Sequence, residues 1–178
     1  MQDNKIVLVT GASSGIGEAC ALRFAREGCR LILTGRRADR LEQLAARIGR
    51  EMDVESLVLV FDVRSRSEAE MMLTTLPPEW QAIDVLINNA GLALDLAPLP
   101  SGDPEDWDTV IDTNVKGLLY VTRVVMGWMM ERRCGHIINI SSIAGREVYP
   151  NGAVYAASKH AVDALTQGLR MDLVTYGI

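Results

Sequence analysis

The chain alternates short, continuously apolar runs with longer amphipathic segments, and this alternation limits the possible folds more than any other feature. A strand buried on both faces reads as an unbroken run of aliphatic residues. The runs expected to form strands are residues 5–10, 30–34, 56–61, 83–88 and 136–140. Helices are expected over residues 15–28, 38–51, from about 65 to the residue before Pro77, 104–133 and 153–176. This order predicts an α/β domain, a doubly wound parallel sheet between two layers of helices.

The first predicted helix is expected to turn one apolar face toward the sheet. Its inward residues are expected to be Ala19, Leu22, Phe24 and Ala25. Gly28 is expected to end the helix, because glycine readily adopts the left-handed conformation that follows a helix.

A glycine-rich turn, TGASSGIG, joins the first strand to the first helix. Its glycines permit a tight turn and close backbone approach, and the helix N-terminus then presents free N–H groups to phosphate. The two serines either add hydroxyl donors or simply cap the helix. The residues expected to form this phosphate site are Gly11, Ser13, Ser14, Gly15, Ile16 and Gly17.

The residues after the second strand indicate which dinucleotide binds. A carboxylate about 20 residues beyond the glycines would bind a ribose 2′-hydroxyl and select NAD. The sequence instead reads LTGRR, and the planar donor forks of Arg36 and Arg37 suit a 2′-phosphate. The pair therefore favours NADP (NADPH). The alternative is that both arginines merely begin the solvated helix that follows.

Charge and cysteine content exclude several classes of protein. The net charge of -5 gives no sign of nucleic-acid or anionic-membrane binding, and 178 residues suffice for one domain. Cys20, Cys29 and Cys134 have no CxxC spacing, so neither a disulfide framework nor a metal site is expected and a reducing cytoplasm is favoured. The N-terminus lacks a signal-peptide pattern, and no uncharged apolar stretch approaches the ~18 residues of a spanning helix.

Six short motifs occur in one order along the chain. They are TGASSGIG (10–17), FDV (61–63), NNAG (88–91), Asn114 in DTNVKG, NISS (139–142) and YAASK (155–159). In order and approximate spacing they resemble the short-chain dehydrogenase/reductase family, from Thr10 to Lys159. The resemblance implies a Rossmann-type sheet with a bound dinucleotide.

The resemblance also implies roles for single residues at the reaction centre. Tyr155 would be the acid/base, and Lys159 would modulate it and bind the nicotinamide ribose. Ser142 would orient the substrate, and Asn114 would support a proton-relay water. Ser141 is a rival for Ser142, which is favoured because it lies thirteen residues before Tyr155, the usual family interval. Around the adenosine the implied contacts are Asp62, Val63, Asn89, Ala90 and Gly91.

The pairing of a phenol with an ammonium has a chemical reason. Removal of a hydride from a secondary alcohol requires loss of the hydroxyl proton, which a free tyrosine cannot readily accept at neutral pH. An ammonium four residues along a helix lies on the same face and favours the phenolate. A serine hydroxyl beside the substrate oxygen can stabilise the developing alkoxide.

A narrower likeness concerns the substrate. Two segments, LPPEWQAIDVLINNAGLALDLAP and EDWDTVIDTNVKGLLYVTR, resemble NADP-dependent 3-hydroxy acid dehydrogenases that oxidise serine, allo-threonine and related acids. The expected function is therefore NADP-dependent hydride transfer involving the secondary alcohol or carbonyl of a small 3-hydroxy acid. The alternatives are a reductase of 3-oxoacyl groups or ketones, and a cofactor-binding regulatory protein without activity.

Residues 1–178 are expected to form a single dinucleotide-binding catalytic domain. Family members continue with a sixth strand, a Pro-Gly turn, a substrate loop and a final strand, which these residues lack; whether this reflects a fragment or a natural end stays open. The methionine-rich helix around Trp128 is expected to be core or interface. By resemblance, this helix and the Tyr155 helix build a homo-oligomer, a dimer or tetramer.

Overall fold

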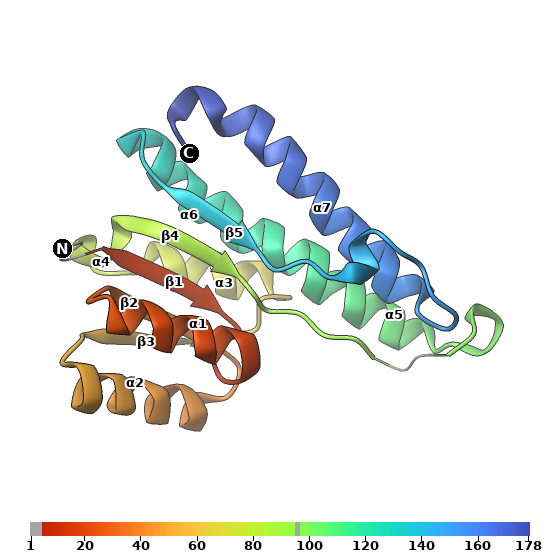
Figure 1. The fold of residues 1–178 in the computed structure, drawn as a ribbon, viewed down its shortest axis with the longest axis horizontal. Helices are drawn as coiled ribbons and strands as arrows, with labels where there is room; N and C mark the ends of the chain where they lie inside the picture. The colour runs from red at the N-terminus through yellow and green to blue at the C-terminus, as the bar shows by residue number, and fades with distance from the viewer. Residues whose placement is uncertain (1–4, 95–96) are drawn as a thin grey trace.

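Five strands form one parallel sheet in the order β3-β2-β1-β4-β5 (Figure 1). The computed structural model describes residues 5–94 and 97–178, so residues 1–4 and 95–96 of the predicted domain lie outside the described residues. The strands are β1 (Ile6–Thr10), β2 (Arg30–Gly35), β3 (Ser56–Val60), β4 (Ile83–Asn88) and β5 (His136–Asn139). All five lie within one residue of the predicted bounds, and the predicted doubly wound α/β sheet is confirmed.

Helices connect successive strands. The α-helices are α1 (Gly15–Arg26), α2 (Ala38–Met52), α3 (Arg66–Thr74), α4 (Pro78–Gln81), α5 (Pro104–Ile111), α6 (Leu118–Arg132) and α7 (Ala153–Leu173). Short 3₁₀ helices are η1 (Leu99–Ser101), η3 (Ile143–Gly145) and η4 (Val174–Tyr176). The predicted helix over 104–133 is interrupted by a π-helical segment, η2 (Asp112–Gly117), which periodicity alone did not reveal.

Two apolar cores lie on opposite faces of the sheet. On one face Val7 and Val9 of β1 pack with buried residues of α1 and α2. On the other face Ile6 and Leu8 pack with α3 and α6. Successive residues of β1 therefore serve opposite cores, which explains why the strand is apolar throughout. The three-layer α/β/α architecture is confirmed.

The inward face of α1 was predicted in part wrongly. Ala25 is buried, and Leu22 and Phe24 are half-buried against the core, but Ala19 is exposed. The buried line is Gly17, Ala21 and Ala25. Gly17 fixes this line at four-residue intervals because it packs against the glycine turn, so Ala19 falls on the outer side. The helix also ends at Arg26, two residues before Gly28, whose φ is +78°.

The strand order places a crevice at the carboxyl ends of β1 and β4. The chain runs from β1 outward to β3 and then crosses back to β4, so the loops after β1 and β4 diverge. Helix α7 packs against α5, η2 and η3 on the same side as this crevice (Figure 1). Among the described residues, no helix is long and apolar enough to cross a membrane.

Candidate active site

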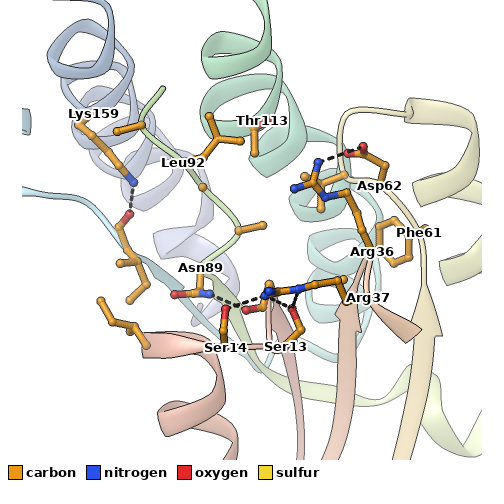
Figure 2. Close-up of a pocket in the computed structure, with 18 of the residues that line it drawn as sticks. Ser13, Ser14, Arg36, Arg37, Phe61, Asp62, Asn89, Leu92, Thr113 and Lys159 are labelled. Atoms are coloured by element: carbon orange, nitrogen blue, oxygen red, sulfur yellow. Dashed lines mark hydrogen bonds and ion pairs between the residues drawn. The ribbon is translucent and has the colours of Figure 1, made fainter. Parts of the chain in front are cut away.

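A cavity of about 590 Å³ opens at the carboxyl ends of the strands (Figure 2). Most of the predicted cofactor-binding and acid/base residues line it: Gly11, Ser13, Ser14, Ile16, Arg36, Arg37, Asp62, Val63, Asn89, Ala90, Gly91, Tyr155 and Lys159. The predicted site residues that do not line it are Gly15, Gly17, Asn114 and Ser142. One cavity thus joins the glycine turn to the Tyr155 helix.

The three glycines of the turn differ in backbone conformation and in what surrounds them. Gly11 has φ +65°, and a Cβ there would lie 3.0 Å from the Cα of Ala90. Gly15 has φ +60° with nothing within 4 Å of such a Cβ. A Cβ at Gly17 would lie 2.4 Å from the Gly11 carbonyl oxygen, so no other residue fits there without a shift. Gly15 therefore faces open space, whereas Gly17 serves packing.

Both serines of the turn bind an arginine. The Arg37 guanidinium donates to the Ser13 hydroxyl through Nε (3.1 Å) and Nη2 (2.7 Å), and to the Ser14 hydroxyl through Nη2 (2.7 Å) (Figure 2). Ser14 precedes α1, but its side chain makes no capping hydrogen bond. The capping alternative is therefore not seen, and the positive end of α1 faces the cavity with an arginine beside it.

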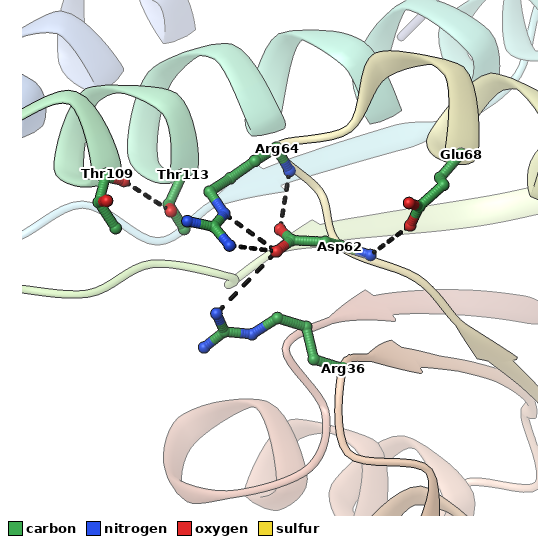
Figure 3. A network of polar contacts seen from close by, with 6 residues as sticks. All are labelled: Arg36, Asp62, Arg64, Glu68, Thr109 and Thr113. Carbon is green, nitrogen blue, oxygen red and sulfur yellow. Dashed lines mark hydrogen bonds and ion pairs between the residues drawn. The ribbon is translucent and has the colours of Figure 1, made fainter. Parts of the chain in front are cut away.

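Arg36 lies on the other side of the same cavity end, across from Asp62 (Figure 3). Its Nη1 is 4.0 Å from the Asp62 carboxylate, which is bound more closely by Arg64. Burial raises the pKa of the Asp62 carboxyl, but hydrogen bonds and charge from Arg64, with the charge of Arg36, outweigh burial and bring that pKa below its usual value. Asp62 is therefore ionised at neutral pH.

The NNAG turn after β4 holds the two halves of the crevice together. The Asn89 side chain donates to the carbonyl oxygens of Thr10 (2.9 Å) and Gly11 (3.1 Å). The Thr10 hydroxyl accepts from the backbone N–H groups of Asn89 and Ala90. A Cβ at Gly91 would lie 3.1 Å from Asn114 Oδ1 and 3.5 Å from Lys159 Nζ. This turn therefore brings the glycine motif and the acid/base residues into one site.

Lys159 is fixed at the cavity wall. Its side chain is buried, and Nζ donates to the carbonyl oxygen of Ile140 at 2.9 Å (Figure 2). Nζ lies 5.9 Å from the centroid of the Tyr155 ring. Burial lowers the pKa of the Lys159 ammonium, and the charge of Asp163 only partly opposes this. The predicted pair on α7 therefore lies together at the inner end of the cavity.

Asn114 lies behind the cavity rather than in its wall. Its side chain accepts from the Leu92 N–H (2.9 Å) and donates to the Leu92 carbonyl (2.9 Å) and the Ser158 hydroxyl (3.0 Å). The residue is buried within the π-helical segment η2. Its amide is thus fully occupied in joining the β4 loop to α7.

The two candidate serines occupy different positions. Ser141 lines the cavity, but its hydroxyl is buried without a hydrogen-bond partner, 2.8 Å from where a Cβ of Gly145 would lie. The Ser142 hydroxyl accepts from the Ala144 N–H at 3.1 Å and begins η3. The Ser142 hydroxyl proton is thus free to be donated. The role of Ser142 in orienting the substrate stays a prediction.

Sequence reasoning missed several lining residues, namely Gly35, Phe61, Leu92, Ala93, Thr113 and Ile140. Gly35 ends β2, and Phe61 and Ile140 directly follow β3 and β5. The rule that ligands bind beyond the carboxyl ends of parallel strands would have identified these three. Leu92 and Thr113 have no sequence signal, since they reach the cavity only through the folding of a loop and η2.

The geometry fits a dinucleotide phosphate. Gly11, Ser13 and Ser14 line the cavity, α1 begins without a side-chain cap, and two arginines line the adjoining wall. Among residues 5–94 and 97–178, no group of three or more His, Cys, Asp or Glu could hold a metal ion.

Comparison with known proteins identifies the family. The sequence model described as short chain dehydrogenase matches residues 5–178. The chain belongs to this family. The NADP-dependent 3-hydroxy acid dehydrogenase YdfG of Escherichia coli (strain K12) is 49% identical over 168 residues, which are 94% of this chain and 66% of that protein. Sulfoacetaldehyde reductase 2 of Chromohalobacter salexigens is 45% identical over 174 residues, 97% of this chain and 68% of that protein.

Solved structures of short chain dehydrogenases share the fold. The closed form of serine dehydrogenase complexed with NADP⁺ is 49% identical with a TM-score of 0.89, covering 94% of this chain and 66% of that one. NAD⁺-bound xylitol dehydrogenase is 36% identical with a TM-score of 0.95, and the match covers 100% of this chain and 68% of that one. The chain spans about two thirds of the length of the curated relatives it matches, 66% for several of them.

Proposed function

We propose that this short chain dehydrogenase is an NADP-dependent oxidoreductase that transfers a hydride between the nicotinamide and the 3-hydroxyl carbon, or the corresponding carbonyl, of a small 3-hydroxy acid such as serine or allo-threonine. One observation carries the proposal: a single cavity is lined by the glycine turn and two arginines and also by Tyr155 and Lys159. The names of the relatives with 49% identity support this substrate class and cofactor.

The cofactor site is divided between phosphate and ribose contacts. The N-terminus of α1 and the glycine turn would hold the pyrophosphate, and Arg36 and Arg37 the 2′-phosphate. Asp62 and Val63 would lie beside the adenine, and the turn formed by Asn89, Ala90 and Gly91 beside the adenosine ribose. NADP supplies the hydride chemistry when bound, and the protein supplies orientation and proton transfer.

The reaction centre would be built on α7 and the loop after β5. Tyr155 accepts the substrate hydroxyl proton in oxidation and returns it in reduction. Lys159 is anchored by the Ile140 carbonyl, so its ammonium stays at a fixed distance from the phenol ring. Ser142 would hydrogen-bond the substrate oxygen, and Asn114 would support the proton relay by fixing the Leu92 loop against α7.

The acid/base assignment is tested with Tyr155→Phe. Loss of the phenol hydroxyl is expected to lower kcat by about 10³-fold, in the range of general acid–base catalysis, while NADPH binding changes little. Tyr176→Phe is the control, because this tyrosine lies at the far end of α7 in η4. Turnover by Tyr155→Phe at the rate of the control would refute the assignment.

The cofactor assignment is tested with the double variant Arg36→Ala, Arg37→Ala. Removal of both guanidinium groups is expected to weaken NADPH much more than NADH in fluorescence titration. Arg47→Ala with Arg50→Ala is the matched control, since both lie on α2 and outside the cavity wall. Equal losses for the two nucleotides would refute the phosphate site.

A second substrate class is favoured by one relative. Sulfoacetaldehyde reductase 2 is 45% identical, and a short sulfonated aldehyde differs from a 3-hydroxy acid in carrying a sulfonate in place of the carboxylate. A panel of serine, allo-threonine, 3-hydroxy acids, sulfoacetaldehyde, a 3-oxoacyl thioester and simple ketones separates these classes by kcat/KM. Tight NADPH binding without turnover of any of them would favour a regulatory protein without activity.

The remaining expectations concern organisation. We propose that the chain is a single domain that acts in the cytoplasm and self-associates as a dimer or tetramer through α6 and α7. The single domain is supported by one sheet that contributes to both apolar cores. Self-association is supported by α6, on which Trp128 and Met130 are only half-buried. Sedimentation velocity with Trp128→Glu tests the association, and an unchanged sedimentation coefficient would refute this interface.

A further inference from the structure

An acidic residue lies at the end of the cavity that would take a phosphate. Asp62 is the only acid among the described residues that line the cavity, and it follows β3 beside the two arginines that follow β2. Its Oδ2 is 4.0 Å from Nη1 of Arg36. A carboxylate there would repel a 2′-phosphate and would also draw Arg36 into an ion pair. An NADP site here therefore requires a cationic partner that neutralises the Asp62 carboxylate.

Arg64 makes three hydrogen bonds to this carboxylate (Figure 3). The Arg64 guanidinium donates to Asp62 Oδ2 through Nε (2.9 Å) and Nη2 (2.7 Å), and the Arg64 backbone N–H donates to Oδ1 (3.0 Å). On the far side, the Asp62 backbone N–H donates to the Glu68 carboxylate at 3.2 Å. These contacts fix the acid from its own loop and from α3, without help from β2.

The consequence for Arg36 follows from the distances. Oδ2 of Asp62 has two closer donors from Arg64, so Arg36 at 4.0 Å contributes only a weak ion pair. The Arg36 side chain is 62% exposed. Asp62 and Arg64 together carry no net charge, so Asp62 compensates the charge of Arg36 only weakly. Arg64 itself is not among the residues that line the cavity.

We propose that Arg64 is a positioning residue for cofactor specificity: by occupying Asp62, it keeps Arg36 available for the 2′-phosphate of NADPH. This inference rests on the proposed NADP site and adds a residue to it. Removal of Arg64 leaves Asp62 uncompensated, so Arg36 moves into an ion pair with it. The 2′-phosphate of NADPH then loses the Arg36 guanidinium as a hydrogen-bond donor and meets the negative charge of Asp62. NADH lacks the 2′-phosphate, so its binding is not affected in this way.

The experiment measures dissociation constants for NADPH and NADH by nucleotide fluorescence, without any substrate. Arg64→Gln is expected to lower the preference for NADPH over NADH by about tenfold, equivalent to about 1.4 kcal/mol. Arg64→Lys keeps the charge and is expected to retain most of the preference. Arg66→Gln is the matched control, because Arg66 is an exposed arginine of the same segment that pairs with Glu70 at 2.9 Å instead. Circular dichroism verifies that each variant is folded.

A second variant separates positioning from simple structural damage. Asp62→Asn with Arg64→Gln removes the acid together with its partner, so the preference for NADPH is expected to return toward that of the original chain. A double variant as impaired as Arg64→Gln alone would overturn the proposal, as would an unchanged preference in Arg64→Gln. Failure of the NADP site itself gives a different result: the original chain would show no preference for NADPH that depends on Arg36 and Arg37.

Discussion

At the scale of single residues, the glycine motif combines two separate constraints. Gly17 is required because a Cβ would meet the Gly11 carbonyl and the Asn89 amide at 2.4 and 2.5 Å. Gly15 is favoured only by its φ of +60°, since a Cβ there would meet nothing within 4 Å. The same residue type is thus needed once for packing and once for backbone conformation.

This difference predicts unequal outcomes for two alanine substitutions. Gly17→Ala is expected to lower the free energy of unfolding by about 3 kcal/mol, because backbone atoms must shift. Gly15→Ala is expected to cost only about 1 kcal/mol of stability, from its left-handed backbone, because a Cβ there meets no other atom. Urea unfolding measures both effects. Equal stability losses would contradict the distinction.

The pKa of Asp62 predicts a pH dependence of stability. Because the folded-state pKa lies below the unfolded value of about 3.9, the carboxylate stabilises the fold above that value, and this contribution is lost as pH falls through the folded pKa. The free energy of unfolding should therefore fall as the pH drops from about 5 through the folded pKa, and less steeply in Asp62→Asn. Glu42→Gln, on the exposed side of α2, is the control. Identical slopes for Asp62→Asn and the original chain would show that the ion pair contributes nothing.

At the scale of elements, a chain of buried amides ties the catalytic helix to the sheet. The Asn88 side chain of β4 donates to the Thr122 hydroxyl of α6 (2.8 Å) and to the side-chain oxygen Oδ1 of Asn139 in β5 (2.9 Å). Asn139 in turn donates to the Thr166 hydroxyl of α7 at 2.9 Å. Helix α7 carries Tyr155 and Lys159 three and two turns earlier, so this anchor sets the position of both.

Removal of the anchor should loosen α7. Thr166→Val keeps the shape of the side chain but leaves the Asn139 amide without its acceptor, at an expected cost of about 1–2 kcal/mol. Hydrogen exchange of the α7 amides should accelerate, and kcat should fall more than NADPH affinity. Thr74→Val, whose hydroxyl bonds only to the backbone of its own helix, should cost less than about 0.5 kcal/mol. Equal exchange in the two variants would argue against an anchoring role.

Helices and strands were predicted well from the sequence where their burial requires apolar residues. The strands are apolar on both faces, so their positions were correct to within a residue. Helix α4 was missed because four residues carry no periodicity, and η2 because a π turn changes hydrogen bonding without changing residue type. At the site, the motif residues were predicted, but Arg64 and Leu92 were not, since their roles arise from contacts and not from spacing.

At the scale of the whole molecule, the cavity draws on every strand of the sheet. Gly11, Gly35, Phe61, Asn89 and Ile140 end or follow the five strands in turn. A ligand bound there contacts both halves of the crevice, so binding and folding are coupled.

NADPH is therefore expected to stabilise the protein against heat. At 100 times its dissociation constant, the gain in unfolding free energy is about 2.7 kcal/mol, or roughly 5–10 °C in Tm for a chain of this size. Differential scanning fluorimetry measures the shift. Arg36→Ala with Arg37→Ala should lose most of it at the same NADPH concentration, whereas Arg66→Gln should not. A Tm unaffected by NADPH in the original chain would contradict the cofactor assignment.

The π-helical turn makes the position of Asn114 dependent on chain length. The residues from Pro104 to Arg132 run as α5, η2 and α6, and a π turn holds about one residue more than an α turn. Each residue of an α-helix advances the side-chain direction by about 100°. A π turn spreads this extra residue over one turn, so deletion of one residue between 112 and 117 would restore an α turn and leave Val121, Val125 and Met129 facing the core. It would instead displace Asn114, which bonds to Leu92 and Ser158, and Thr113, which lines the cavity. Substitutions elsewhere in this turn should therefore disturb the site less than a single-residue deletion.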